Sequence, residues 1–154
     1  IETYNAIIKP DTFTKLDPNI TKLTGITDDK IKEEGKNIKD VFKEIKPLFK
    51  KIDCINAYNM NFDKNVLLSE LYRIHDREFI KIISNLQSEC TFKLSKQILY
   101  MGSYKMEHVY KELFKVDPKQ DHRAFNDAIL CKDVYYKLKQ VYKENKKKNK
   151  YKNK

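Results

Sequence analysis

The sequence predicts an α/β domain. Short β-prone runs at residues 3–8, 52–58 and 86–91 alternate with longer stretches whose apolar residues recur at helical spacing. Such an alternation is typical of a sheet covered by helices. The chain has 154 residues, 40% of them apolar, which suits one domain with its own core. Three strands are few for a stable sheet, so we expect a helix-rich domain with a partial sheet.

The first third of the chain is expected to contain one strand and three helices. Residues 3–8 form the strand, and residues 18–24 form one or two helical turns. Thr27 can cap a further short helix, because its hydroxyl can accept a hydrogen bond from the first turn. From Ile38 to Ile52 the apolar residues recur at steps of three and one, which predicts an amphipathic helix.

The rest of the chain predicts two strands, each followed by a helix. Asn59 and Asn61, good turn and cap residues, follow the run at residues 52–58. The pattern over residues 79–83 fits more than one type of element and is left open. Helices are expected from Asn61 onward, after residue 91, at 106–114, and from about 125 to 142.

The positive charge is concentrated at one end of the chain. Against 22 acidic residues stand 32 Lys and Arg, a net charge of +10, and residues 143–154 alone carry +6 of it. We therefore divide the chain into a domain over residues 1–142 and a lysine-rich tail over residues 143–154, which we expect to be disordered. Two interpretations of the tail stay open: it follows a polyanion such as DNA or RNA, or it is a solvated end.

Several classes of protein are excluded. No apolar run approaches the roughly 20 residues that a membrane helix needs, and no signal peptide is visible. Cys54, Cys90 and Cys131 lie far apart without a CxxC pair, which argues against a zinc cluster or a disulfide framework. We expect an intracellular protein of the cytoplasm or nucleus.

A first candidate site follows the second predicted strand. Residues 59–63 read Asn-Met-Asn-Phe-Asp and open a helix. The carboxylate of Asp63 would stand at the carboxyl end of a strand, where α/β folds place ligands. The alternative is that Asp63 is an ordinary acid at a helix N-terminus, where it complements the helix dipole.

A second candidate site opens the last helix. His122 and Asp127 lie five residues apart, so a histidine just before the helix could lean toward the site that Asp127 faces. The alternative is a surface histidine with an exposed acid. Asp127, however, falls among the small residues Ala124, Ala128 and Cys131, which allow close helix packing. A carboxylate on such a face needs a partner, and a metal ion is one candidate.

These side chains suit one chemistry. Asp63 and Asp127 can hold Mg²⁺ or Mn²⁺ through oxygen. Two such ions clamp the attacking and leaving oxygens of a phosphodiester. The imidazole of His122, with a pKa near neutrality, can take a proton from the attacking water.

The two segments also resemble motifs of a known family. Residues 58–63, Tyr-Asn-Met-Asn-Phe-Asp, are similar to a motif His-Asn-x-x-Phe-Asp, with tyrosine in place of histidine. Residues 122–128 match His-x-Ala-x-x-Asp-Ala at every named position. These are the second and third motifs of the DEDDh 3′–5′ exonucleases, the proofreading type with an RNase H-like fold. Ile7–Pro10, Thr24–Thr27 and Cys90–Thr91 resemble further family segments in the same order, so the resemblance covers about Glu2 to Tyr142.

One motif of the family is absent. Its first strand carries Asp-x-Glu, and the chain has no such sequence before Pro10. Glu2 fits better as the start of the third strand of the fold. The resemblance therefore implies an N-terminally truncated exonuclease-type domain that lacks strands one and two and two of four metal-binding carboxylates. We expect little activity from the chain alone, and the sequence leaves open whether it is an enzyme.

The resemblance implies a metal-dependent 3′–5′ exonuclease that releases nucleoside monophosphates from DNA or RNA. Asp63 and Asp127 would bind two Mg²⁺ or Mn²⁺ ions with the missing acids, and His122 would be catalytic. Ile26, Asn59 and Phe62 would shape the pocket for the 3′ nucleotide, and a polymerase is a possible partner. The alternatives are a degenerate module that only binds nucleic acid and a structural or adaptor fragment.

Overall fold

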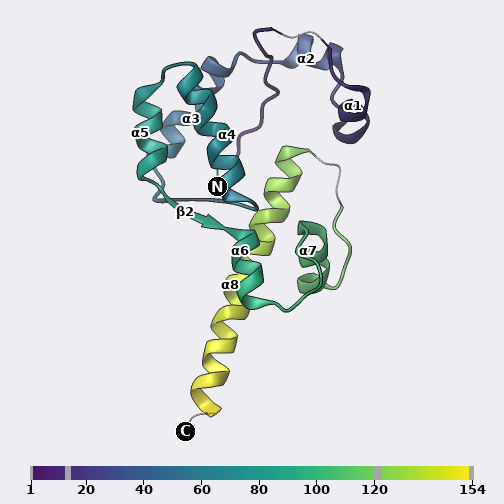
Figure 1. The fold of residues 1–154 in the computed structure, drawn as a ribbon, viewed down its shortest axis with the longest axis vertical. Coiled ribbons are helices and arrows are strands. Elements are labelled where there is room, and N and C mark those ends of the chain that lie inside the picture. The colour runs from purple at the N-terminus through teal and green to yellow at the C-terminus, as the bar shows by residue number, and fades with distance from the viewer. Residues whose placement is uncertain (1, 13–14, 120–122, 153–154) are drawn as a thin grey trace. The chain divides into compact units, whose positions relative to one another are not determined.

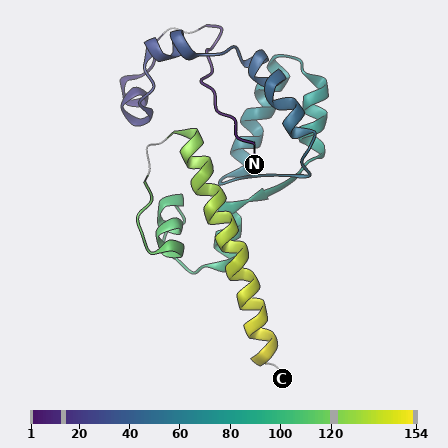
Figure 2. The same cartoon turned by 180° about the vertical axis from the view of Figure 1, so that it is seen from behind.

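The computed structural model describes residues 2–12, 15–119 and 123–152 (Figures 1 and 2). Within these residues it confirms the predicted helix-rich α/β domain with a partial sheet. The helices are α1 (Pro18–Thr24), α2 (Asp28–Glu34), α3 (Ile38–Phe49), α4 (Met60–Arg73), α5 (Arg77–Asn85), α6 (Thr91–Ile98), α7 (Met106–Phe114) and α8 (Ala124–Lys152), and the strands are β1 (Cys54–Ala57) and β2 (Gln87–Cys90).

The chain forms two compact units that each contain several segments. Unit 1 consists of Ile1–Cys54, Val66–Gln87 and Asp121–Arg123, and unit 2 of Ile55–Asn65, Ser88–Gln120 and Ala124–Lys154. Each unit has its own cluster of buried apolar side chains. The predicted boundary at residue 142 falls within α8, inside unit 2, and the proposed lysine-rich tail beyond it stays a prediction.

The core of unit 1 is built around Phe79 on α5. Its ring is fully buried and meets Phe42 and Phe49 of α3 edge-on, with ring centroids 5.7 and 5.1 Å apart. Asp76 begins the helix, because its carboxylate accepts a hydrogen bond from the Phe79 N–H at 3.0 Å and pairs with Lys46 Nζ at 2.6 Å. The segment 79–83, left open by the sequence, is therefore helical, and a capping acid three residues before Phe79 was the available signal.

Residues 3–8 do not form the predicted strand. The backbone of this segment makes a single parallel bridge between Ile8 and Lys36, in which Lys36 N donates to Ile7 O at 2.8 Å and Lys9 N donates to Lys36 O at 2.9 Å. A strand needs a neighbour along its length to pair its N–H and C=O groups. Within the described residues this segment has no such neighbour, so its β propensity is not expressed.

The strands β1 and β2 form the predicted partial sheet and run in the same direction. Backbone hydrogen bonds join Gln87 N to Asp53 O at the start of the pair and Phe92 N to Tyr58 O at its end. Both chains therefore leave the sheet at the same edge. The turn that carries Asn59 and the beginning of α6 both follow this edge, which is where parallel strands place ligand-binding residues.

Unit 2 is held together by α8, against which α6 and α7 pack (Figures 1 and 2). Val109 on α7 and Val134 and Leu138 on α8 are fully buried at this contact. Val134 and Leu138 are among the apolar residues at helical spacing that predicted the last helix. Within the described residues, no helix is both long enough and apolar enough to cross a membrane.

Helix α8 does not end near Tyr142, as the sequence predicted, but continues to Lys152 and runs beyond α6 and α7 (yellow in Figures 1 and 2). The continuation is supported along the helix itself. Gln140 Nε2 donates to Glu144 Oε1 at 3.0 Å, and Lys146 Nζ lies 4.7 Å from the centroid of the Tyr142 ring. Lys and Glu are also good helix formers, so the helix continues past Tyr142 into this lysine-rich stretch.

The two clusters predict two separable effects on stability. Phe79→Ala removes the ring at the centre of unit 1 and should lower the free energy of unfolding by about 3–5 kcal/mol, and Leu138→Ala in unit 2 by about 2–5 kcal/mol. Hydrogen exchange followed by mass spectrometry measures where protection is lost. We expect each variant to lose protection first in its own unit, and equal loss across both units from either variant would contradict the division.

Candidate functional site

The first candidate carboxylate is positioned by the turn between β1 and α4. The backbone carbonyl of Asn59 accepts hydrogen bonds from the N–H groups of Phe62 at 2.9 Å and Asp63 at 3.2 Å. This starts α4 directly after the strand and fixes Asp63 in its first turn. The predicted strand, turn and helix start are therefore all present, and Asp63 stands at the carboxyl end of β1 as expected.

The pKa of Asp63 is raised above its ordinary value. Partial burial of the carboxylate is the main cause, and the backbone N–H of Asp63 opposes it in part. An acid that served only to complement a helix dipole would have its charged form favoured. Removal of water from the charged carboxylate instead makes its ionised form costly, and a bound cation would offset that cost.

The neighbours of Asp63 present unusual side chains to solvent. Phe62 is 65% exposed although it is a large apolar residue. Asn59 is exposed and lines a pocket at the end of β1. The exposed ring of Phe62 and the exposed amide of Asn59, both close to Asp63 in the chain, are suited to contact a ligand that has apolar and polar groups.

The second candidate carboxylate, Asp127, lies in the first turn of α8. Its Oδ1 atom is buried and accepts no hydrogen bond from any described residue. An unsatisfied buried polar atom costs about 1–3 kcal/mol, and more where the group is charged. Of the small residues near Asp127, Cys131 is buried but Ala124 and Ala128 are exposed, so the close-packed face expected there is present only in part. That a metal ion pairs with the Asp127 oxygen stays a prediction.

Asp63 and the first turns of α8 belong to the same compact unit and influence a common residue. Cys131, one turn after Asp127, is 6% exposed, and its thiol donates to Asn56 Oδ1 and Thr91 Oγ1, both at 3.5 Å. Burial raises the pKa of the Cys131 thiol, and the charge of Asp63 raises it further. Asp63 and Asp127 therefore belong to the same compact unit, and the charge of Asp63 acts on a residue one turn after Asp127.

A network of hydrogen bonds between short side chains links the ends of β1 and β2 to α6 and α8. Thr91, fully buried at the start of α6, donates its hydroxyl to Asn56 Oδ1 at 3.0 Å, and Asn56 Nδ2 donates to Glu89 O at 3.1 Å. These bonds fasten β1, β2 and α6 to one another. Because the amide oxygen of Asn56 also accepts from Cys131, the network includes α8 and holds the helix that carries Asp127.

The donor set fits a hard divalent cation. Carboxylate oxygens are the ligands that Mg²⁺ and Mn²⁺ prefer, and the buried Asp127 oxygen has an unused lone pair. Among the described residues, no group of three or more His, Cys, Asp or Glu side chains gathers at metal-binding distance. A metal ion held by Asp63 or Asp127 would therefore need further oxygen ligands, water among them.

Two of the predicted site residues cannot be placed in this site from the structure. His122 lies outside the described residues. Ile26 belongs to unit 1, where its N–H donates to Thr24 Oγ1 at 3.2 Å in the turn after α1. Their proposed roles, as a catalytic base and as a contact to the substrate, stay predictions.

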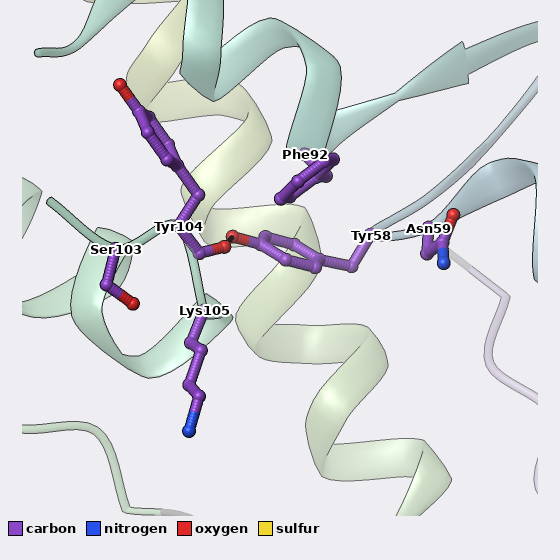
Figure 3. Close-up of a pocket in the computed structure, with 6 residues that line it drawn as sticks. All are labelled: Tyr58, Asn59, Phe92, Ser103, Tyr104 and Lys105. Atoms are coloured by element: carbon purple, nitrogen blue, oxygen red, sulfur yellow. Dashed lines mark hydrogen bonds between the residues drawn. The ribbon is translucent and has the colours of Figure 1, made fainter. Parts of the chain in front are cut away.

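Sequence reasoning missed a second feature of unit 2. Tyr58, Phe92 and Tyr104 line a pocket of about 380 Å³ together with Asn59, Ser103 and Lys105 (Figure 3). Tyr58 and Phe92 lie at the carboxyl ends of β1 and β2, so an aromatic residue at the end of each of these two predicted strands was the signal that could have found it.

Comparison with known proteins gives the class. A family model described as exonuclease, of the RNase T type, matches residues 1–135. The chain therefore belongs to the exonuclease family, as the motifs indicated, and a DEDDh-type exonuclease family is supported.

A particular relative adds a context. The chain is 32% identical over 138 residues to a DNA polymerase III of the PolC type from Mycoplasmopsis pulmonis (strain UAB CTIP). The match covers 88% of this chain but only 9% of that polymerase. The chain is thus similar to a small part of a much longer protein.

The unpartnered oxygen of Asp127 predicts a stabilising substitution. In buffer that contains a chelator, Asp127→Asn should raise the free energy of unfolding by about 1 kcal/mol, because a neutral amide costs less to bury than an unpaired carboxylate. Chemical denaturation measures this. Addition of Mn²⁺ should then raise the melting temperature of the wild type more than that of the variant.

The matched control is Asp133→Asn on the same helix, whose carboxylate already pairs with Lys132 Nζ at 3.4 Å. It should change stability by less than about 0.5 kcal/mol and keep the full response to Mn²⁺. A destabilised Asp127→Asn variant with an undiminished response to Mn²⁺ would contradict the assignment.

The raised pKa of Asp63 predicts a pH dependence. Because the folded state binds the proton of this carboxyl more tightly than the unfolded chain does, its protonated form favours folding. That contribution is complete below the ordinary Asp pKa of about 3.9 and is lost as the pH rises through the raised folded value. Relative to Asp63→Asn, the wild type should therefore lose stability over this window, as measured by denaturation at successive pH values without metal. A wild type that gains stability relative to the variant over the same window would show that the sign is wrong.

Proposed function

We propose that this domain is a metal-dependent nuclease that removes nucleotides from the 3′ end of a nucleic acid. The observation that carries the proposal is the buried, unpartnered Asp127 oxygen in the same compact unit as the partly buried Asp63 carboxylate. Membership of the exonuclease family supports a nuclease role and implies a nucleic-acid substrate.

Each predicted residue takes a role that its chemistry allows. Asp63 and Asp127 would hold Mg²⁺ or Mn²⁺, and the exonuclease family generally uses divalent metals. When bound, such ions stabilise negative charge on the oxygens of the phosphate undergoing hydrolysis. His122 would accept the proton of the attacking water, whose oxygen bonds to phosphorus as the bond to the 3′ oxygen breaks. The product is a nucleoside monophosphate.

The substrate contacts are proposed on the same basis. Phe62, with its exposed ring beside Asp63, would contact the terminal nucleotide, and Asn59 would offer its amide. Ile26 is assigned to this pocket by the resemblance of its segment to the family. A polymerase is proposed as a partner, because the similar protein from Mycoplasmopsis pulmonis is a DNA polymerase III of the PolC type.

A second candidate function has its own supporting observation. Among the described residues, no group of three or more His, Cys, Asp or Glu side chains gathers where it could hold a metal ion. A module that has lost hydrolysis but still binds nucleic acid would look the same, with the lysine-rich end of α8 contacting phosphates. It predicts binding that weakens steeply with salt and no release of nucleotides.

One assay separates the two functions. The chain as given, and the chain extended upstream in its own gene, are incubated with Mg²⁺ and oligonucleotides labelled at the 5′ end, of DNA and of RNA. Hydrolysis from the 3′ end gives a ladder of shortening labelled products, whereas hydrolysis from the 5′ end releases the label at once. Asp63→Ala, Asp127→Ala and His122→Ala should each lower the rate by about 100-fold or more.

The matched controls are Asp133→Ala, an acid on the same helix as Asp127, and His75→Ala, an exposed histidine of unit 1. Both should keep the rate of the wild type. Salt-sensitive binding without release by either wild-type form would favour the binding module. Release that survives the three site substitutions would remove the site assignment.

A further inference from the structure

Unit 2 contains a further pocket that includes neither candidate carboxylate. It is lined by the first residues of α4, the end of β2, one side of α6 and a lysine of α8, all of which belong to unit 2. It shares no lining residue with the aromatic pocket of Tyr58, Phe92 and Tyr104. Its volume of about 290 Å³ is close to the lower end of the roughly 300–1,000 Å³ that small-molecule sites occupy. The pocket therefore suits a small ligand.

The acid that lines this pocket already has partners within unit 2. Glu89 Oε2 lies 3.1 Å from Lys139 Nζ, and the hydroxyl of Tyr135 donates to the same carboxylate. These contacts lower the pKa of Glu89, with the hydrogen bond from Tyr135 as the largest cause, so the carboxylate is ionised at neutral pH. Because the charge of Lys139 matches that of Glu89, this side of the pocket carries no net charge.

The remaining charge at the pocket is positive. Lys93 lines it and forms no ion pair with any described residue. Lys64 also forms none, and its Nζ donates to Ser88 Oγ, in the wall of the pocket, at 3.1 Å. Two ammonium groups without an acidic partner in the described part of the chain therefore favour an anionic ligand.

The pocket also offers polar groups that can orient a ligand. Asn61 and Gln97 are exposed and line it, and their side-chain amides make no hydrogen bond with another described residue. Met60, which is 6% exposed, and Leu94 provide apolar surface beside these amides. An amide has both donors and an acceptor and can therefore pair with hydroxyl groups in either direction. The lining suits a ligand that carries hydroxyl groups as well as negative charge.

We propose that this pocket binds a small phosphomonoester whose organic part carries hydroxyl groups, either a sugar phosphate or a nucleoside monophosphate. A phosphomonoester carries a charge of about −1.5 to −2 at pH 7, which matches the two ammonium groups of Lys64 and Lys93. These lysines would hold the phosphate as point charges, and the amides of Asn61 and Gln97 would pair with the hydroxyl groups. The inference does not depend on the proposed nuclease function.

Binding of defined small molecules tests the proposal. Isothermal titration calorimetry is carried out in a chelator, so that no metal ion contributes at Asp63 or Asp127. The probes are ribose 5-phosphate, adenosine 5′-monophosphate, inorganic phosphate and ribose. We expect both phosphomonoesters to bind, inorganic phosphate to bind about 10-fold more weakly or less tightly still, and ribose to show no binding. Tighter binding of adenosine 5′-monophosphate would identify a nucleotide as the ligand, and equal or tighter binding of ribose 5-phosphate a sugar phosphate.

Two substitutions at exposed positions of α6 separate the contacts. Lys93→Gln should weaken binding of ribose 5-phosphate by about 10-fold or more, because it removes a charge-assisted hydrogen bond. Gln97→Leu should weaken binding of ribose 5-phosphate by about 3- to 10-fold and leave that of inorganic phosphate unchanged. The matched control is Lys96→Gln on the same helix, whose ammonium lies 4.9 Å from the centroid of the Phe92 ring and outside the pocket. It should leave both affinities unchanged.

Nuclear magnetic resonance of the ¹⁵N-labelled wild type locates the ligand without any variant. Backbone amide shifts at Asn61, Lys93 and Gln97 on addition of ribose 5-phosphate would support the pocket. Shifts confined to the surroundings of Asp63 and Tyr104 would overturn it. Affinity for ribose 5-phosphate no higher than for inorganic phosphate, an unchanged affinity in Lys93→Gln, or no binding by the wild type would overturn it as well. Each of these results is independent of whether the chain hydrolyses a nucleic acid.

Discussion

A buried carboxylate oxygen that accepts no hydrogen bond from the described residues, Asp127 Oδ1, is the constraint on which the proposed site depends. Val134 and Leu138, about two and three turns further along α8, are fully buried and fix the helix face that also carries Asp127. The packing of α8 therefore offsets the free-energy cost of burying Asp127 Oδ1 without a hydrogen bond. Strain of this kind at a functional site is common where a ligand supplies the missing partner.

The short parallel strands β1 and β2 position the other candidate carboxylate, Asp63. Because β1 and β2 end at the same edge, a turn that begins α4 follows β1 there, and α6 begins directly after β2. Helix α4 carries Asp63 in its first turn, and the start of α6 places Thr91 within hydrogen-bond distance of the Cys131 thiol on α8. Four residues of strand on each side thus position the acid, the supporting network and the aromatic pocket in one compact unit.

The sequence predicted those parts whose signal is local. The strand that ends before Asn59, the turn at Asn59 and the helix that carries Asp63 follow from propensity. The close packing expected around Asp127 is not seen at Ala124 and Ala128, which are both exposed. The prediction of a strand at residues 3–8 was wrong, because a strand forms only beside a neighbouring strand, which propensity does not reveal. The end of α8 was misjudged because net charge was weighed above the helix preference of lysine. The pocket was missed because Tyr58, Phe92 and Tyr104 are joined only by the fold.

The most direct measurement of the central claim is a crystal structure of the chain soaked in Mn²⁺, with the ion located by its anomalous scattering. A peak at bonding distance from Asp127 Oδ1, with the Asp63 carboxylate in the same coordination sphere or joined to it through water, is the predicted result. A fully hydrogen-bonded Asp127 carboxylate, with no peak beside either acid, would contradict the account.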